Sequence, residues 1–303
     1  MQVTKAVVPA AGLGTRLYPV TRSQPKEMLP LGDRPTIQGV AEEVEGAGIT
    51  DVLLITSAAK RAIEDHFDPS GAQSAPHADP SAYPLQARYY CTRQRSPRGL
   101  GDAVLHGREF VGQNHFLVAL GDCVLLSPEP SGPVRRMVQA HTDFEADATI
   151  VMQMVDAAGT AKYGIADPGE ELAEGVIELT DIVEKPGPEK APSRMAVAAR
   201  YIFSPRIFEL LEETGPGHGK EIQLTDAIRA MIAEGGRVLA VQLRTGEMRL
   251  DVGNFDSYGR SFMRSMLTHN EYGPKLRCYA SELLAHLDDE TMPDPDVPTD
   301  DNI

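Results

Sequence analysis

Residues 6–16, AVVPAAGLGTR, followed by PKEMLP at residues 25–30, are the stretch that decides the fold. Residues 6–9 form a short apolar run typical of a buried parallel strand, and the small residues after it let the backbone pass close to a ligand. The N–H groups of such a loop can bind phosphate oxygens, and Arg16 and Lys26 add two cations that can neutralise a triphosphate. This stretch therefore predicts a nucleotide site.

Two common glycine motifs do not fit this loop. The dinucleotide fingerprint needs a third glycine three residues after the second, where this chain has Leu17. The P-loop needs Gly-Lys-Ser/Thr, and here Gly14 is followed by Thr15 and Arg16. Taken alone, residues 6–16 fit an ordinary strand-to-helix turn with a surface arginine equally well. The prolines on either side of Lys26 favour a rigidly placed cation and hence a functional site.

The composition restricts the class of protein. The chain has 303 residues, and its 29 Lys and Arg against 44 Asp and Glu give a formal charge of −15. We therefore expect no nucleic-acid partner and no anionic membrane surface, so an anionic substrate has to be bound locally. No apolar run is long enough to span a bilayer and the N-terminus begins with a strand, which predicts a cytoplasmic location. The three distant cysteines are expected to be free thiols.

Strands and helices alternate in the first half of the chain. The expected strands are 6–9, 52–56, 88–92 and 116–122, and the expected helices are 38–47, 58–66, 101–111 and 133–144. This order is the signature of a doubly wound parallel sheet. The second half is richer in strands, expected at 148–155, 163–166, 175–183, 196–203 and 238–243, with helices at 205–213 and 223–234.

The chain resembles the sugar-1-phosphate nucleotidylyltransferases, and most closely the bacterial UTP–glucose-1-phosphate uridylyltransferases. The two opening blocks carry this resemblance, and further blocks follow in the family's order across roughly residues 3 to 270. These are IEDHFD at 63–68, GLG at 99–101, GD at 121–122, YG at 163–164, VEKP at 183–186, APS at 191–193, RY at 200–201, EIQLTD at 221–226 and DVG at 251–253. The resemblance implies a magnesium-dependent enzyme that makes UDP-glucose and pyrophosphate from UTP and glucose 1-phosphate.

The fold and the domains follow from the same resemblance. We expect an α/β, Rossmann-like, mostly parallel sheet flanked by helices, with a β-rich portion that binds the sugar, as in nucleotide-diphospho-sugar transferases. Residues 1–270 would form one domain, with its nucleotide-binding half at about 1–130 and its sugar-phosphate-binding half at about 131–270. Residues 271–303 would be an extension with an acidic, disordered tail, and residues 69–86 an exposed loop. The family expectation is a homo-oligomer, either a dimer or a tetramer.

Two acids stand where a metal ion would be expected. Nucleotidyl transfer brings several anions together, so charge compensation and alignment are the main tasks of the protein. Asp122 follows a buried apolar run, at the carboxyl end of a strand where open parallel sheets bind ligands. The resemblance assigns Asp122 and Asp251 to Mg²⁺. Without it, Asp251 fits a helix N-cap or a turn better, and Cys123 replaces a second aspartate of many relatives.

The resemblance also assigns the phosphate contacts of the nucleotide. Arg16 would hold the β- and γ-phosphates with its fork of donors, and Lys26 would stabilise charge on the α-phosphate and on the departing pyrophosphate. The loop residues expected to bind the nucleotide are Ala10, Ala11, Gly12, Gly14 and Thr15.

The base and the sugar phosphate have their own predicted contacts. Gln94 offers one acceptor and two donors to a pyrimidine edge, and Gly99 offers its backbone nearby. On the sugar side, Lys185 would pair with the sugar phosphate and Glu184 would accept bonds from ring hydroxyls, while Gly164 would let the sugar approach the backbone.

Some positions leave the family pattern and keep alternatives open. Asp102 replaces a histidine, Ala199 replaces a glycine, residues 255–257 replace Lys-Leu-Gly, and the loop at 69–86 is short. The same reaction with another base, another hexose or a cyclitol phosphate is therefore one alternative. A non-catalytic nucleotide-sugar sensor is a second, and a dehydrogenase is a third that the missing third glycine opposes.

Overall fold

The computed structural model describes residues 2–68, 85–217 and 220–286, and the strand ahead of the glycine loop lies inside its central sheet. Strand β1 (Lys5–Pro9) lies between β4 (Asp51–Thr56) and β6 (Phe116–Ala119). Strand β5 (Arg88–Arg93) completes a parallel group in the order β5-β4-β1-β6. Because these strands are parallel, the loops after them all lie at one edge of the sheet.

The rest of the sheet is mainly antiparallel. Strand β11 (Met195–Phe203) runs antiparallel to β6 and to β8 (Ala148–Met154), and β8 pairs in parallel with β12 (Val238–Gln242). Strands β10 (Val176–Glu184) and β9 (Gly164–Ala173) complete a sheet of nine strands. The short turn between β9 and β10 permits only antiparallel pairing. The predicted α/β class is confirmed, but the sheet is mixed rather than mostly parallel, because most of the parallel pairing lies in the first half.

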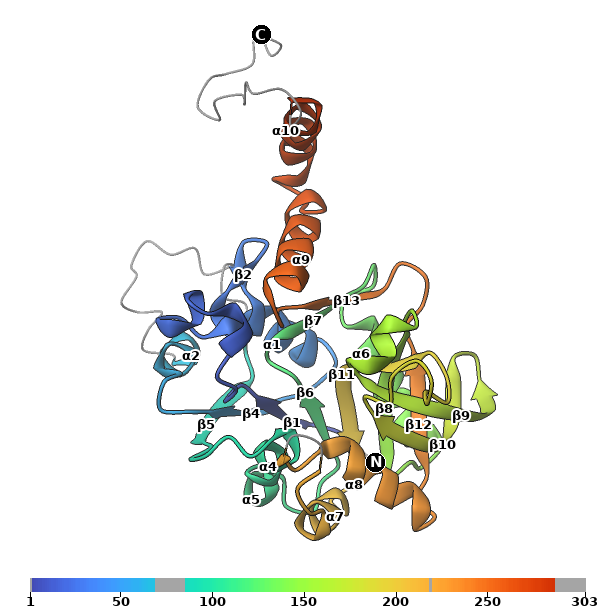
Figure 1. Cartoon of the computed structure of the whole chain (residues 1–303). Helices are drawn as coiled ribbons and strands as arrows, with labels where there is room; N and C mark the ends of the chain where they lie inside the picture. The colour runs from blue at the N-terminus through green and yellow to red at the C-terminus, as the bar shows by residue number, and fades with distance from the viewer. Residues whose placement is uncertain (1, 69–84, 218–219, 287–303) are drawn as a thin grey trace.

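Helices cover both faces of this sheet (Figure 1). The residues of β1 alternate between two apolar cores, because Val7 faces one core while Ala6 and Val8 face the other. The helices in the core of Val8 are α1 (Thr36–Glu45), α2 (Arg61–Phe67) and α6 (Gly132–Asp143), and those in the core of Val7 are α4 (Leu100–Leu105), α5 (Arg108–Val111), α7 (Ile207–Glu213) and α8 (Leu224–Ala233). The predicted helix at 101–111 is thus two short helices.

A small two-stranded sheet, which the sequence analysis did not predict, lies beside the large one. Strand β7 (Cys123–Leu126) pairs antiparallel with β13 (Met248–Asp251), and the register places Asp251 opposite Cys123. The strand predicted at 116–122 therefore ends at Ala119. Two residues that are more than 120 positions apart in the sequence, Asp122 and Asp251, are brought together by this pairing.

A buried ion pair anchors β7 beneath this region. The Arg200 guanidinium is fully buried and donates to both carboxylate oxygens of Glu43, at 2.9 and 2.7 Å. It also donates to the Cys123 carbonyl at 2.8 Å, and Glu43 in turn accepts from the N–H of Leu125 at 3.2 Å. Arg200 therefore ties β11 and α1 to the strand that follows Asp122.

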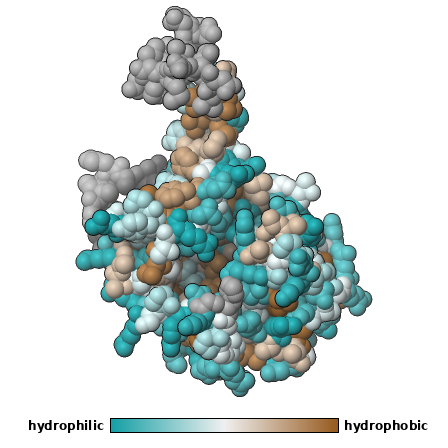
Figure 2. Space-filling view, in the orientation of Figure 1, coloured by the Kyte–Doolittle hydropathy of each residue, from teal (hydrophilic) through white to brown (hydrophobic). Residues whose placement is uncertain are grey.

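The end of the described chain forms a helical arm. Helix α9 (Phe255–Leu267) begins with a capping box between Asn254 and Ser257, and α10 (Gly273–His286) continues away from the body (Figure 1). Figure 2 shows apolar surface on this arm. The predicted acidic tail and most of the loop predicted at 69–86 lie outside the described residues. Among the described residues, no helix combines the length and apolar character needed to cross a bilayer.

Candidate active site

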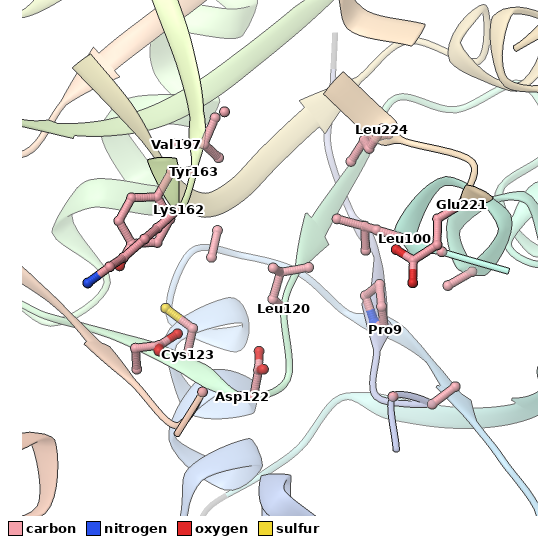
Figure 3. A pocket seen from close by; sticks show the side chains of 18 of the residues that line it. Pro9, Leu100, Leu120, Asp122, Cys123, Lys162, Tyr163, Val197, Glu221 and Leu224 are labelled. Carbon is pink, nitrogen blue, oxygen red and sulfur yellow. The ribbon is translucent and has the colours of Figure 1, made fainter. Parts of the chain in front are cut away.

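A cavity of about 920 Å³ opens where the parallel strands end. The segments that follow β1, β5 and β6 all line it, as expected at the carboxyl edge of such a sheet. Figure 3 shows Tyr163 and Cys123 on one side of the cavity and Leu100 and Glu221 on the other, with Asp122 between them. The cavity brings together every residue that the sequence predicted for the site, namely Ala10, Ala11, Gly12, Gly14, Thr15, Arg16, Lys26, Gln94, Gly99, Asp122, Gly164, Glu184, Lys185 and Asp251.

The glycine loop places an available cation at the cavity. Gly14 has a φ of 67°, a conformation that favours glycine, and its carbonyl accepts a bond from the Thr21 hydroxyl at 2.9 Å. A short 3₁₀ turn over Thr15–Leu17 then presents Arg16, which is exposed. No ion pair holds Arg16 within the described part of the chain. Its guanidinium is therefore available to bind a phosphate.

The two predicted metal-binding acids lie side by side, each paired with a cation. The Val252 N–H donates to the Asp122 carbonyl at 3.0 Å, which continues the pairing of β7 with β13. The Asp122 carboxylate accepts a bond from Lys26, and the Asp251 carboxylate accepts one from Arg249 at 2.8 Å. Burial opposes the charge of Asp122, but Lys26 and Arg249 together outweigh it, and the pKa of the Asp122 carboxyl lies below its usual value. Both acids therefore line the cavity, each beside a protein cation.

Arg249 is a cavity residue that the sequence analysis missed. Its side chain is only 8% exposed, and its guanidinium lies over the Tyr163 ring at 4.4 Å from the centroid. Burial opposes its charge, but the acidic groups around it raise the pKa of the Arg249 guanidinium above its usual value. The available signal was the spacing, because residues two apart in a strand point to the same face and Asp251 is two positions away.

A second missed feature is a buried ion pair behind Lys26. The Lys60 Nζ donates to Glu27 Oε2 at 2.5 Å, and both side chains are almost fully buried. Burial raises the pKa of the Glu27 carboxyl and lowers the pKa of the Lys60 ammonium. Because Glu27 also attracts its neighbour Lys26, charges of alternating sign run from Lys60 through Glu27 and Lys26 to Asp122.

The residues predicted to bind the sugar phosphate also line the cavity. Lys185 adopts a φ of 46°, its N–H donates to the Tyr163 carbonyl at 3.1 Å, and its Nζ lies 3.0 Å from Glu184 Oε1. The other carboxylate oxygen of Glu184 accepts a bond from the Thr225 hydroxyl at 2.7 Å. Gly164 lies directly opposite Glu184 in the register of β9 with β10. A positive and a negative group thus stand together, as a phosphorylated polyol would require.

On the side of the cavity that is predicted to bind the base, the backbone at Gly99 passes close to the backbone at Ile222. Gly99 has a φ of 106°, and a Cβ there would lie 2.7 Å from the Ile222 carbonyl oxygen, so only glycine fits. The side chain of Gln94 is buried and its amide nitrogen is within hydrogen-bond distance of Asp102 at 2.5 Å and of the Gly99 carbonyl at 3.4 Å. Gln94 was predicted to offer one acceptor and two donors to the base. Both donors are therefore used inside the protein, and only the acceptor is left for a ligand.

The donor set of the cavity fits Mg²⁺. Within the described residues no cluster of three or more His, Cys, Asp or Glu could hold a metal ion by itself. Asp122 and Asp251 provide two carboxylates, and Mg²⁺ is commonly held by one or two carboxylates together with substrate phosphates. Burial raises the pKa of the adjacent Cys123 thiol to about 12, so this side chain stays protonated and is a poor ligand.

Comparison with known sequences shows extensive similarity. The model of a family described as nucleotidyl transferase matches residues 5–266. The UTP–glucose-1-phosphate uridylyltransferase of Streptococcus pneumoniae serotype 4 is 38% identical over an alignment of 291 positions, which covers 93% of this chain and 96% of that protein. The protein of the same name from Streptococcus pyogenes is 36% identical over an alignment of 309 positions, which covers 96% of this chain and 98% of that protein.

Solved structures show the same similarity in three dimensions. A UDP-glucose pyrophosphorylase complexed with UDP-glucose is 37% identical, with a TM-score of 0.78 over 86% of this chain and 97% of that one. A UTP-bound UGPase from Acinetobacter baumannii is 32% identical, with a TM-score of 0.82 over 93% and 100% of the two chains.

Proposed function

The chain belongs to the nucleotidyl transferase family, and we propose that it transfers the uridylyl group of UTP to glucose 1-phosphate, giving UDP-glucose and pyrophosphate. The observation that carries this proposal is the cavity, which gathers every predicted site residue at one edge of the sheet. Five cationic side chains line it beside five acidic ones, so the cavity is more positive than the whole chain, which has a charge of −15. A pyrophosphate-release assay with different nucleotides and sugar phosphates tests the proposal.

The residues of the cavity suit an in-line displacement. A phosphate oxygen of glucose 1-phosphate would form a bond to the α-phosphorus of UTP, and the bond from that phosphorus to the bridging oxygen of pyrophosphate would break. We propose that Arg16 binds the outer phosphates and that Lys26 stabilises charge on the α-phosphate. Lys185 and Glu184 would orient the sugar phosphate, so that the two reactants meet beside Asp122.

We propose that Asp122 and Asp251 hold Mg²⁺. When bound, the ion would supply charge neutralisation for the phosphates, which adds to that provided by the protein cations. Lys26 and Arg249 already balance the two carboxylates, so these cations are placed to turn toward phosphate oxygens when a metal takes the carboxylates.

The alternatives differ in how well the cavity supports them. Another base or another sugar or cyclitol phosphate would use the same machinery, and the assay grid separates these pairs. The sensor alternative predicts loss of catalytic groups, yet Arg16, Lys26, Asp122 and Asp251 all line one cavity. The cytoplasmic location and the lack of nucleic-acid and membrane partners stay predictions.

Replacing Lys185 with alanine is expected to raise the KM for glucose 1-phosphate roughly 10- to 100-fold, because a charge-assisted bond to the sugar phosphate is lost. The KM for UTP should change little. Steady-state kinetics with each substrate varied in turn measure both constants. The matched control is Lys190→Ala, which removes an exposed lysine of the same loop outside the cavity. A larger change in the KM for UTP than in that for glucose 1-phosphate would contradict the assignment.

We also propose that the chain forms a homo-oligomer, a dimer or a tetramer, through the arm of α9 and α10. Met263 and Leu284 of this arm are 60% and 67% exposed, and Tyr272 and Tyr279 are exposed as well. A second copy suits this surface because each arm offers the same apolar residues to the other. Light scattering after size exclusion should give a multiple of 32.8 kDa for the full chain, and a lower mass for Met263→Glu/Leu284→Glu. A monomeric wild-type mass would contradict the proposal.

A further inference from the structure

The Gln94 side chain presents one selected atom to the cavity. Gln94 follows strand β5, its own N–H extends the pairing with β4 by bonding the Thr56 carbonyl at 2.9 Å, and the residue is 6% exposed. Its amide nitrogen contacts Asp102 and the Gly99 carbonyl. Within the described residues its amide oxygen makes no hydrogen bond, and it is not among the fully buried atoms that lack a partner. The oxygen is thus the atom that Gln94 can offer to a ligand.

Asp102 decides this orientation. It lies in the first turn of α4, is 2% exposed, and holds Gln94 Nε2 with one carboxylate oxygen and the Arg98 guanidinium with the other, at 2.5 and 2.7 Å. An ionised carboxylate only accepts hydrogen bonds, so the NH₂ end of the Gln94 amide has to face it. The opposite amide orientation would place two acceptor oxygens 2.5 Å apart in a buried site, which is strongly unfavourable.

A fixed acceptor discriminates between pyrimidines. The ring nitrogen at position 3 carries a hydrogen in uracil and is a bare acceptor in cytosine. An amide oxygen aimed at this position gains a hydrogen bond from uracil and faces a second acceptor in cytosine. Thymine carries the same N–H, so this device does not separate UTP from dTTP.

We propose that Asp102 is a specificity-positioning residue, which locks the Gln94 amide so that its oxygen selects bases with an N–H at ring position 3. This inference rests on the proposed function for the placement of the base beside Gln94. The resembling family often has histidine at the position of Asp102, and a histidine ring nitrogen can either donate or accept. The carboxylate of this chain allows one orientation only.

The test measures nucleotide affinity by calorimetry without the sugar phosphate, so it needs no turnover. The wild-type protein should bind UTP roughly 10- to 100-fold more tightly than CTP. The same preference is expected for UTP over N3-methyl-UTP, which has lost the N–H at ring position 3. In Asp102→Asn the amide at 102 can donate as well as accept, so Gln94 can turn over. The ratio of the affinity for UTP to the affinity for CTP is then expected to fall about 10-fold. The matched control is Asp147→Asn, which makes the same change outside the cavity and should keep the wild-type ratio.

Two results would overturn the inference. One is an Asp102→Asn protein that is folded and keeps the UTP-to-CTP ratio within twofold of wild type. The other is wild-type protein that binds N3-methyl-UTP as tightly as UTP, a result that does not depend on the variant folding. If wild type selects UTP in binding but releases no pyrophosphate with any sugar phosphate, the proposed reaction fails and the inference stands.

Discussion

Replacing Asp122 with alanine is expected to lower turnover roughly 100- to 1,000-fold. The variant loses one of the two carboxylates proposed for Mg²⁺ and also the partner that holds Lys26 in place. The fold should survive, because the Val252 N–H bonds the backbone carbonyl of residue 122, which alanine retains. Pyrophosphate release measures the activity, and circular dichroism during heating measures the fold.

Two further variants help to interpret this result. Asp256→Ala removes an exposed aspartate at the start of α9, outside the cavity, and should keep wild-type activity. Asp122→Asn keeps the shape of the side chain and loses its charge, so its activity should be close to that of the alanine variant. A folded Asp122→Ala protein with near-normal turnover would remove Asp122 from the proposed site.

Replacing Lys60 with methionine is expected to destabilise the protein by about 3–5 kcal/mol, because the Glu27 carboxylate is left buried without its partner. For a chain of this size the unfolding midpoint should fall by roughly 10 °C. Activity should also fall, roughly 10-fold, because an uncompensated Glu27 draws its neighbour Lys26 away from Asp122. Thermal melting and steady-state kinetics measure the two effects.

The charge-balanced variant Glu27→Gln/Lys60→Met separates a charge effect from a loss of packing. It removes both charges of the pair, so most of the stability and most of the activity should return relative to Lys60→Met. If the double variant is as inactive as the single one, Glu27 and Lys60 do not act through the charge of Lys26.

The main strands could be predicted because their signal is local. The apolar runs of β1, β4 and β6 are typical of buried parallel strands, and these three strands pair in parallel in the sheet. Strands β7 and β13 could not be found in this way, because each is short and is defined by a partner far away in the sequence. Helix α9 was not predicted although apolar residues recur along it at helical spacing, and two of them, Tyr258 and Phe262, pack against a small core separate from those of the large sheet.

The site residues also differ in whether a local motif or a distant contact defines them. The glycine loop, Lys26 and the base and sugar residues lie in motifs, and all of them reach the cavity. The local interpretation of Asp251 as an N-cap or turn residue was wrong, because pairing with β7 makes it the last residue of a strand. The contacts of Lys60 with Glu27 and of Asp102 with Gln94 depend on how separate elements pack, so the sequence motifs alone did not indicate them.

The central claim is tested most directly by pyrophosphate release in the presence of Mg²⁺. UTP, dTTP, CTP, GTP and ATP would each be combined with glucose 1-phosphate and with several other sugar and cyclitol phosphates. We predict that UTP with glucose 1-phosphate gives the highest kcat/KM of all pairs. A different best pair would keep the reaction and change the substrates. Absence of release with every pair would contradict the claim that this chain is a nucleotidyltransferase.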